Sequence, residues 1–250
     1  MPLSAAIITF NEARNLPRCL ASLEGVADEI VVLDSFSTDT TEQIAREAGA
    51  RFEQHAFDGH IQQKNRAIGL CTHDLVLSLD ADEALDDTLR AHILAIKADP
   101  QFRAYSFNRL TNYCGKWVRH TGWYPDVKTR LFDRNIARWG GVNPHDKIEL
   151  DPGLHPAHLK GDLLHYSYYT REDHLKQIEY FSGIAAQELY DRGRKGSWGL
   201  VVIKVVAQFF KSFVLKAGFL DGYTGWTISR LSAYATYRKY RKLMLLHAQG

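Results

Sequence analysis

The sequence predicts an α/β protein with an open, mostly parallel β-sheet, helices on both faces of that sheet, and a helical C-terminal tail. Short apolar runs alternate with helix-like stretches up to residue 80, which is typical of parallel strands joined by crossover helices. The chain has 250 residues, of which 45% are hydrophobic and 24% charged, a globular balance that excludes a disordered or fibrous protein.

The tail is distinguished by its charge. Residues 192–250 contain eleven Lys/Arg and one acid, Asp221, for a formal charge of +10, whereas residues 1–191 carry −8. An acidic body with a basic, apolar tail indicates that the tail meets an anionic surface.

Four strands are expected in the first part of the chain. Three are continuous apolar runs, which indicate strands buried on both faces: 3–10, 29–33 and 75–79. A short strand is expected at 51–55. The intervening helices are expected to end near Glu24 and Gly49 and to cover 59–70.

The pattern changes after about residue 100. Three short aromatic segments of alternating polarity predict antiparallel strands added to the sheet: 103–110, 113–119 and 127–133. Residues 139–165 are expected to be loop-rich because several Gly and Pro interrupt them. A helix is expected at 171–191.

The tail predicts an amphipathic helix over 197–217. Its polar residues fall on one stripe of a helical wheel: Lys204, Gln208, Lys211, Ser212 and Lys216. A membrane-spanning helix would rarely carry three lysines near its centre, so a helix lying in the membrane interface fits better. The polybasic segment 237–242 would add attraction to an anionic leaflet. Packing on the protein body or on a second copy is the alternative.

The cysteines indicate a reducing compartment. Cys19, Cys71 and Cys114 lie far apart with no CxxC pair, which argues against a disulfide framework and a thiolate zinc site. The first residues lack the basic start of a signal peptide, so none is expected.

Acidic and polar residues follow three of the predicted strands. They are Asn11 and Glu12, Asp34 and Ser35, and the segment Asp80 to Glu83. In an open parallel sheet, ligands bind outside the carboxyl ends of the strands. Asp80 and Asp82, two residues apart at a strand end, suit Mg²⁺ or Mn²⁺ bound together with a diphosphate. No GxGxxG follows the first strand and no GxxxxGK[ST] occurs, so the usual dinucleotide and P-loop signatures are missing.

Several motifs in order resemble the signatures of family 2, GT-A-fold glycosyltransferases. They are ITFNE at 8–12, DSFSTDTT at 34–41, QQKNRA at 62–67 and LSLDADE at 77–83. The resemblance is closest to the subgroup containing the lipopolysaccharide inner-core β-1,4-glucosyltransferase. Three later pieces match that subgroup: His145-Asp146, LHYSY at 164–168 and GFLDGYTG at 218–225.

The resemblance implies an inverting transfer of a sugar from a nucleotide-diphosphate donor, with UDP-glucose favoured. It assigns donor binding to Thr9, Glu12, Asp34, Lys64 and Asp80. It assigns the metal, Mg²⁺ or Mn²⁺, to Asp82 and His165.

The catalytic base is expected to be Asp146. An inverting transferase needs a carboxylate opposite the leaving diphosphate to take the proton of the acceptor hydroxyl. Asp146 matches the acid of the subgroup's His-acid pair, where Glu is the commoner residue. Glu149 and Asp126 are the alternatives.

The sequence therefore predicts a metal-dependent glycosyltransferase with a GT-A catalytic domain at 1–191 and a basic helical tail at 192–250. Residues 1–100 would form the nucleotide-binding half and 101–170 the acceptor and base half. The expected acceptor is a lipid-linked glycan such as the lipopolysaccharide core. The expected location is the inner face of the cytoplasmic membrane, bound peripherally through 197–242, with no nucleic-acid partner. A sugar-nucleotide nucleotidyltransferase and a non-catalytic nucleotide-sugar-binding module are the alternative functions.

Overall fold

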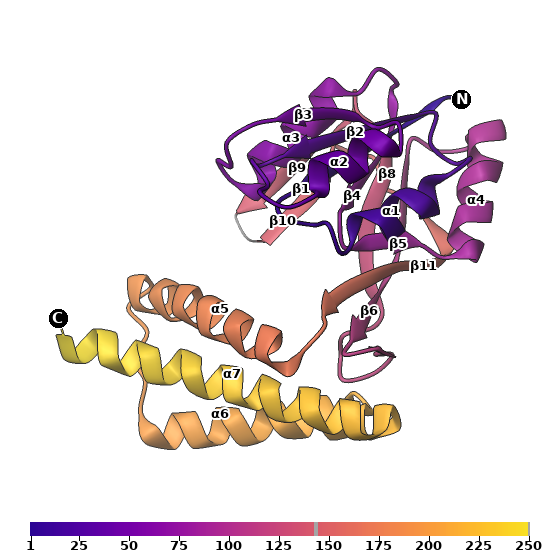
Figure 1. Cartoon of the computed structure of the whole chain (residues 1–250). Helices are drawn as coiled ribbons and strands as arrows, with labels where there is room; N and C mark the ends of the chain where they lie inside the picture. Colours follow the sequence, from indigo (N-terminus) through magenta and orange to yellow (C-terminus); the bar gives the residue numbers. More distant parts are fainter. Residues whose placement is uncertain (143–144, 250) are drawn as a thin grey trace. The chain divides into compact units, whose positions relative to one another are not determined.

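The computed structural model describes residues 1–142 and 145–249. Its main sheet has the strand order β3-β2-β1-β4-β8-β6-β11-β5, and these strands are labelled in Figure 1. A further short strand, β7, pairs with β6. The first four strands run parallel, as the sequence predicts: β1 (Leu3–Thr9), β2 (Glu29–Asp34), β3 (Arg51–Gln54) and β4 (Leu75–Asp80). The helices between them are α1 (Leu16–Leu23), α2 (Thr41–Glu47) and α3 (His60–Leu70).

Alternate side chains of each central strand enter two separate cores, one on each face of the sheet. On β1, Leu3, Ala5 and Ile7 pack with buried residues of α1, α2 and α4 (Asp87–Ala98). Ala6 packs with α3 on the other face. Helices therefore cover both faces, and the predicted α/β fold is confirmed.

The sheet continues with antiparallel strands beyond β4. β8 (Asp126–Asp133) pairs antiparallel with both β4 and β6 (Ala104–Tyr113), and β5 (Glu83–Leu85) pairs antiparallel with β11 (Ala157–Tyr168). The short β7 (Lys116–Trp117) pairs antiparallel with β6. Helix α4 was not expected from the sequence. Its N-cap is Asp86, whose side chain accepts a hydrogen bond from the Leu89 N–H at 2.7 Å.

The prediction of a loop-rich segment at 139–165 is wrong. β9 (Ala137–Val142) and β10 (His145–Leu150) form a separate antiparallel pair, and β11 follows. Two glycines of this segment, Gly140 and Gly161, allow close packing instead. A Cβ on Gly140 would lie 2.4 Å from the Glu149 carboxyl carbon, and a Cβ on Gly161 would lie 2.4 Å from the Leu89 backbone nitrogen. Gly161 also has φ +106°, which L side chains rarely adopt.

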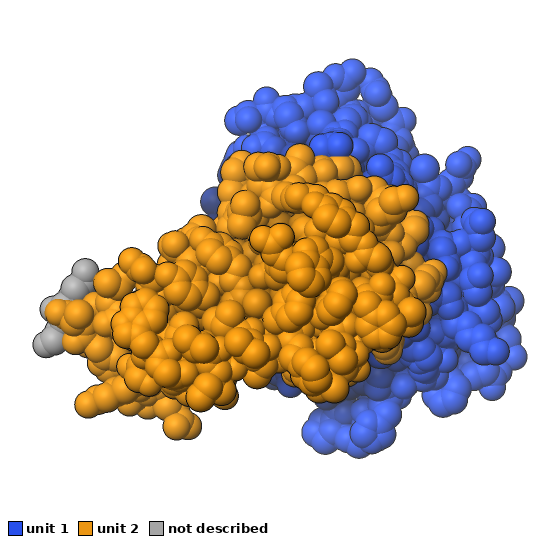
Figure 2. All heavy atoms as spheres, turned by 90° about the horizontal axis from the view of Figure 1, so that it is seen from below, with its two compact units in different colours: residues 1–109, 126–166 blue, residues 110–125, 167–250 orange. Residues whose placement is uncertain are grey.

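The chain divides into two compact units, shown in different colours in Figure 2. Unit 1 comprises residues 1–109 and 126–166, and unit 2 comprises 110–125 and 167–250. Helix α5 (Arg171–Asp191) belongs to the same unit as the tail helices, whereas the sequence analysis grouped it with the catalytic part. As a division of function, the boundary at residue 191 stays a prediction.

Unit 2 is built around a long helix, α7 (Gly222–Gln249), which packs against α5 and α6 (Trp198–Phe210). A π-helical turn, η1 (Lys211–Leu215), and a 3₁₀ turn, η2 (Gly218–Asp221), lead into α7. A Cβ on Gly225 would lie 1.8 Å from the Gly218 carbonyl oxygen, so GFLDGYTG needs glycine where η2 meets α7. The Asp221 carboxylate accepts hydrogen bonds from the backbone N–H and the ring of His120, both at 2.8 Å.

The helical segment Trp198–Leu215 leaves most of its apolar residues exposed. By length and composition alone, this is the one helix among the described residues that could cross a membrane. The predicted tail helix is confirmed, and its relation to a membrane stays a prediction.

We predict that unit 2 loses stability in mild acid through His174. His174 is buried beside Tyr113, Trp123 and Tyr168, and burial lowers its pKa from 6.5 to about 4. The unfolded chain therefore binds a proton that the native chain does not, so stability is lost as the pH falls from about 6.5 towards 4, by at most about 1.4 kcal/mol per pH unit.

Urea unfolding at pH 7 and pH 5, followed by tryptophan fluorescence, tests this. His174→Phe should show a smaller loss of stability between these two pH values than the wild type. His155→Gln, at an exposed histidine of unit 1, is the control and should keep the wild-type difference. An unchanged pH difference in His174→Phe would refute the assignment.

Candidate active site

The polar residues predicted to bind the donor gather at the carboxyl ends of β1, β2 and β4. Thr9 and Asp34 are paired in register on adjacent strands, and the Thr9 hydroxyl donates to Asp34 Oδ1 at 2.8 Å. Both side chains are buried. The Asp34 carboxylate also accepts from the Ser37 N–H at 2.7 Å and from the Ser37 hydroxyl at 2.5 Å. Asp34 therefore shapes the β2–α2 loop, and its predicted role in donor binding stays a prediction.

Glu12 lies after β1, close to the acidic residues that follow β4. Burial raises its pKa, and the carboxylates of Asp82, Asp39 and Asp80 raise it further against a hydrogen bond from Asn15 that lowers it. The fold thus brings together acids from two strand ends, as the sequence predicts for an open parallel sheet.

Lys64 links the two halves of the predicted site. It lies on α3 with a side chain only 6% exposed, and its ammonium group is 3.0 Å from Asp80 Oδ1 and 2.8 Å from Asp146 Oδ2. It also lies 4.2 Å from the centre of the buried Trp139 ring. Burial alone would raise the pKa of Asp80, but Lys64 and Arg130 outweigh it and hold that pKa well below its ordinary value. One buried cation therefore holds the predicted donor-site aspartate beside the predicted base.

Sequence reasoning missed a second set of charges behind this pair. Arg130 on β8 and Arg109 on β6 both contact Glu83, at 3.2 Å and 3.4 Å. Glu83 is fully buried and its Oε2 accepts the Asp80 N–H at 3.0 Å, which fixes the turn after β4. The signal in the sequence was an arginine, Arg130, directly before the apolar residues Leu131 and Phe132 of a predicted strand, since a buried arginine almost always has a charged partner.

Asp82 and His165 meet at the same end of β4. Asp82 Oδ2 lies 3.2 Å from His165 Nε2, and the Asp82 carbonyl accepts the Tyr166 N–H at 2.9 Å. A carboxylate and an imidazole are a suitable pair of ligands for Mn²⁺, and a carboxylate suits Mg²⁺. The described residues contain no group of three or more potential ligands, so a metal held here would take further ligands from water or a bound phosphate.

Of the two alternative bases, Asp126 is held by two cations, whereas Glu149 packs beside a glycine. Asp126 pairs with Arg109 at 2.8 Å and with Lys128 at 2.9 Å. The Glu149 carboxyl lies against the Cα of Gly140. His145 precedes Asp146 in the sequence motif. Its backbone belongs to β10, and its side chain lies outside the described part of the structure.

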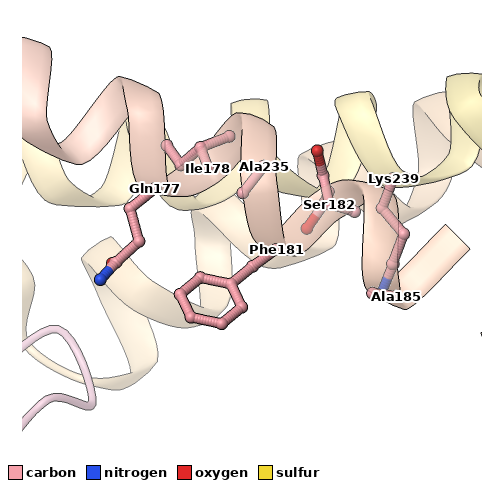
Figure 3. A pocket seen from close by; sticks show the side chains of 8 residues that line it. Gln177, Ile178, Phe181, Ser182, Ala185, Ala235 and Lys239 are labelled. Atoms are coloured by element: carbon pink, nitrogen blue, oxygen red, sulfur yellow. The ribbon is translucent and has the colours of Figure 1, made fainter. Parts of the chain in front are cut away.

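A cavity in unit 2 has a different character. It has a volume of about 270 Å³ and lies between α5 and α7. Figure 3 shows its lining side chains, which include Ile178, Phe181, Ala235 and Lys239. Burial lowers the pKa of Lys239, and the nearby Lys204 lowers it further. No carboxylate lines the cavity, so it lacks the chemistry of the site in unit 1.

Comparison with known proteins identifies the class. Residues 4–148 match the family model described as "Glycosyl transferase family 2". An uncharacterized glycosyltransferase of Rickettsia bellii (strain RML369-C) is 30% identical over 258 residues, which cover 99% of this chain and 87% of the relative. The protein is therefore a glycosyltransferase. It belongs to glycosyl transferase family 2, as the motifs predict.

More distant similarities cover between 44% and 100% of the chain. The lipopolysaccharide core biosynthesis glycosyltransferase LpsC of Rhizobium meliloti (strain 1021) is 27% identical over 254 residues, covering 96% of this chain and 93% of the relative. Among solved structures, S. aureus TarS 1-349 is 15% identical with a TM-score of 0.45, covering 100% of this chain and 92% of that chain. Glucosyl-3-phosphoglycerate synthase from Mycobacterium tuberculosis is 20% identical with a TM-score of 0.36, covering 44% of each chain.

Lys64→Met is predicted to destabilise unit 1 because it leaves Asp80 and Asp146 without their shared cation. Removing one partner of a buried ion pair costs about 3–5 kcal/mol. We expect about 2–4 kcal/mol here, because the Asp80 side chain keeps 27% exposure and the Asp146 side chain 15%. Urea unfolding at pH 7 measures it.

Arg46→Met is the matched control. It removes an exposed ion pair with Glu42 on α2 and a contact with the Phe52 ring, and should cost no more than about 1 kcal/mol. Equal effects of the two substitutions would show that Lys64 does not hold the site together.

Proposed function

We infer that the protein transfers a sugar, with inversion, from a UDP-sugar such as UDP-glucose to a lipid-linked glycan. The observation that carries this proposal is the Lys64 ammonium between Asp80 and Asp146. It joins the end of a buried parallel strand, where nucleotides bind in such sheets, to a carboxylate that matches the acid of the subgroup motif. The family assignment favours this function over a nucleotidyltransferase and over a binding module.

Asp82 and His165 are the residues proposed to hold Mg²⁺ or Mn²⁺. When bound, the ion would neutralise charge on the leaving diphosphate. Asp80 is already engaged by Lys64 and Arg130, so its expected contribution is to keep Lys64 at the donor site. Glu12, whose carboxylate is close enough to Asp82 and Asp80 to be influenced by their charges, is proposed to belong to the same donor site.

Asp146 is proposed to take the proton of the acceptor hydroxyl as the oxygen attacks the anomeric carbon and the diphosphate leaves. Before the donor binds, Lys64 engages Oδ2 of this carboxylate. An incoming diphosphate would compete with Asp146 for the Lys64 ammonium. Donor binding would then free the base at the moment it is needed.

The proposed acceptor is the growing core of a lipopolysaccharide or a similar lipid-linked saccharide. Its support is the similarity to LpsC over 96% of the chain, since that relative is named for lipopolysaccharide core biosynthesis.

Two substitutions assayed together test this function. Asp82→Ala should abolish metal-dependent release of UDP from UDP-glucose. Asp146→Asn should retain UDP binding while transfer falls by roughly 10²–10⁴, the usual contribution of a general base. Asp87→Ala, at an exposed residue in the first turn of α4, is the control for both and should turn over like the wild type.

Each role has its own contrary outcome. Metal-dependent turnover by Asp82→Ala at the wild-type rate would remove the metal role from Asp82. Normal transfer by Asp146→Asn would move the base to Glu149 or Asp126. A wild-type protein that binds no nucleoside diphosphate in the presence of Mn²⁺ or Mg²⁺ would refute the function itself.

The tail is proposed to hold the enzyme at the anionic inner face of the cytoplasmic membrane. Support comes from apolar side chains spaced four residues apart along α6 and η1, all at least 43% exposed: Trp198, Val202, Val206, Phe210 and Val214. We call this row the α6 ridge. Arg238 and Lys242 of the polybasic segment pair with Glu179 inside unit 2, so the ridge, rather than residues 237–242, would make the larger contribution.

Vesicle co-sedimentation tests this surface. Replacing Val206 and Phe210 together with Ser should weaken binding to vesicles containing phosphatidylglycerol at least tenfold, because each side chain contributes about 1.5–3 kcal/mol when fully buried. Leu94→Ser, at a 41% exposed leucine of α4, should not weaken it. Failure of the wild type to bind such vesicles at low salt would refute the membrane proposal, and dimerisation lost on ridge substitution would assign the surface to a second copy.

A further inference from the structure

Asp146, the proposed base, lies on a pair of strands outside the main sheet. Within the described residues, β9 and β10 pair with each other and with no strand of that sheet. A two-stranded ribbon is only marginally stable in water by itself. The position of the Asp146 carboxylate therefore depends on the contacts that fasten this pair of strands to the rest of unit 1.

The face of the pair that carries Asp146 is fastened by a buried tryptophan. Asp146 and Ile148 alternate on β10, and Trp139 lies opposite Ile148 on β9, so all three side chains share one face. Trp139 is 3% exposed and packs in one core with Ala67 of α3. Its indole N–H donates to Ser78 Oγ of β4 at 3.1 Å. The Trp139 ring thus joins the strand pair to both α3 and the sheet.

Asn65 of α3 holds the main chain of β9 at the same residue. Its side-chain amide donates to the Trp139 carbonyl at 2.9 Å and accepts the Trp139 N–H at 2.9 Å. A residue of a neighbouring antiparallel strand makes such a pair of bonds, so the amide closes the outer edge of β9 in place of a strand. An amide offers a donor and an acceptor side by side, whereas a carboxylate only accepts, which accounts for Asn at this position.

The backbone bonds of Asn65 and the ion pair of Lys64 come from consecutive residues of α3. Lys64 holds the Asp146 carboxylate directly, at 2.8 Å. Once a donor diphosphate competes for Lys64, as proposed above, this ion pair no longer keeps the carboxylate in place. The bonds between Asn65 and the Trp139 backbone involve no charged group, so they would persist through that exchange.

We propose that Asn65 is a positioning residue that keeps the Asp146 carboxylate in place during transfer by fixing the Trp139 backbone. The inference rests on the proposed function, which makes Asp146 the base. In this role Asn65 acts through β9 and needs no contact with the donor or the acceptor. Loss of its amide would slow the chemical step and leave donor binding unchanged, because Lys64 and the strand ends stay in place.

Metal-dependent release of UDP from UDP-glucose, in which Asp146 would take a proton from water, tests the proposal. Asn65→Ala should lower kcat about 10- to 100-fold, because misplacing a reacting group by about 1 Å can cost about 100-fold. KM for UDP-glucose should keep its wild-type value, and so should the Kd for UDP measured by titration calorimetry with Mn²⁺. The melting temperature should fall by only a few degrees, as expected for lost hydrogen bonds.

A double-mutant cycle with Asp146→Asn separates positioning from general damage. Residues that act as a unit give strongly non-additive effects. The variant with both substitutions should therefore release UDP as fast as Asp146→Asn alone, because no base is left to misplace.

Asn135→Ala is the matched control. Asn135 also belongs to unit 1, and its amide donates to Asp133 Oδ1 at 3.0 Å in the turn between β8 and β9. The substitution removes an asparagine hydrogen bond next to β9 but none to the Trp139 backbone, so this variant should release UDP like the wild type.

The outcomes separate this inference from the function on which it rests. A wild-type kcat in Asn65→Ala overturns the positioning role and leaves the proposed function standing. Effects that multiply in the double variant, or loss of UDP binding in Asn65→Ala, assign Asn65 to the fold as a whole and also overturn the inference. Normal UDP release by Asp146→Asn removes the base that Asn65 is proposed to position. A wild type that neither binds UDP nor releases it from UDP-glucose overturns the proposed function, and the inference with it.

Discussion

The arrangement of the site depends on the buried ammonium group of Lys64. The fold gathers Glu12, Asp80, Asp82 and Asp146 at one edge of the sheet, and like charges in a poorly hydrated place repel each other strongly. Lys64 lies between two of them at 3.0 Å and 2.8 Å. A lysine can occupy this position because α3 packs on the sheet through Ala67 and Ile68, which places residue 64 one helical turn earlier on the same face.

Arg130 and Arg109 compensate the negative charge of the buried Glu83 carboxylate in the same way. The Arg130 side chain is 4% exposed, and its Nε has no hydrogen-bond partner within the described part of the chain. Its other contacts must therefore offset a substantial desolvation cost, and they include Glu83, Asp80 and the face of Trp139. Breaking such a set by removing one member costs more than any single contact within it contributes.

The parts of the site that the sequence predicts are those that depend on local order along the chain. Asp34 and Asp80 end apolar strands, and neighbouring parallel strands bring their carboxyl ends together by geometry alone. The pairing of Lys64 with Asp146 joins residues 82 positions apart, and nothing in either segment encodes that distance. The pairing of Glu83 with Arg130 was missed for the same reason, because β8 meets β4 only through long-range antiparallel pairing. The loop expected at 139–165 failed because a glycine can mark a close approach between elements as well as a turn.

In part of the unit 2 tail, small and hydroxyl-bearing side chains lie inside and large apolar side chains lie outside. This is the reverse of the usual pattern in a water-soluble protein. η1 buries Ser212, whose hydroxyl accepts from the buried Ser229 of α7 at 3.0 Å, and Gly218 and Gly225 meet where η2 approaches α7. Small and hydroxyl-bearing residues thus lie between these elements, while the α6 ridge is turned outward. In water this arrangement adds little hydrophobic stabilisation, because the exposed Val and Phe side chains of the ridge are not removed from water on folding. In an apolar environment the same arrangement is favourable, because close packing and hydrogen bonds between helices are what hold such helices together. The packing within unit 2 is thus a second reason, besides the charge of the tail, for the proposal that the α6 ridge contacts lipid.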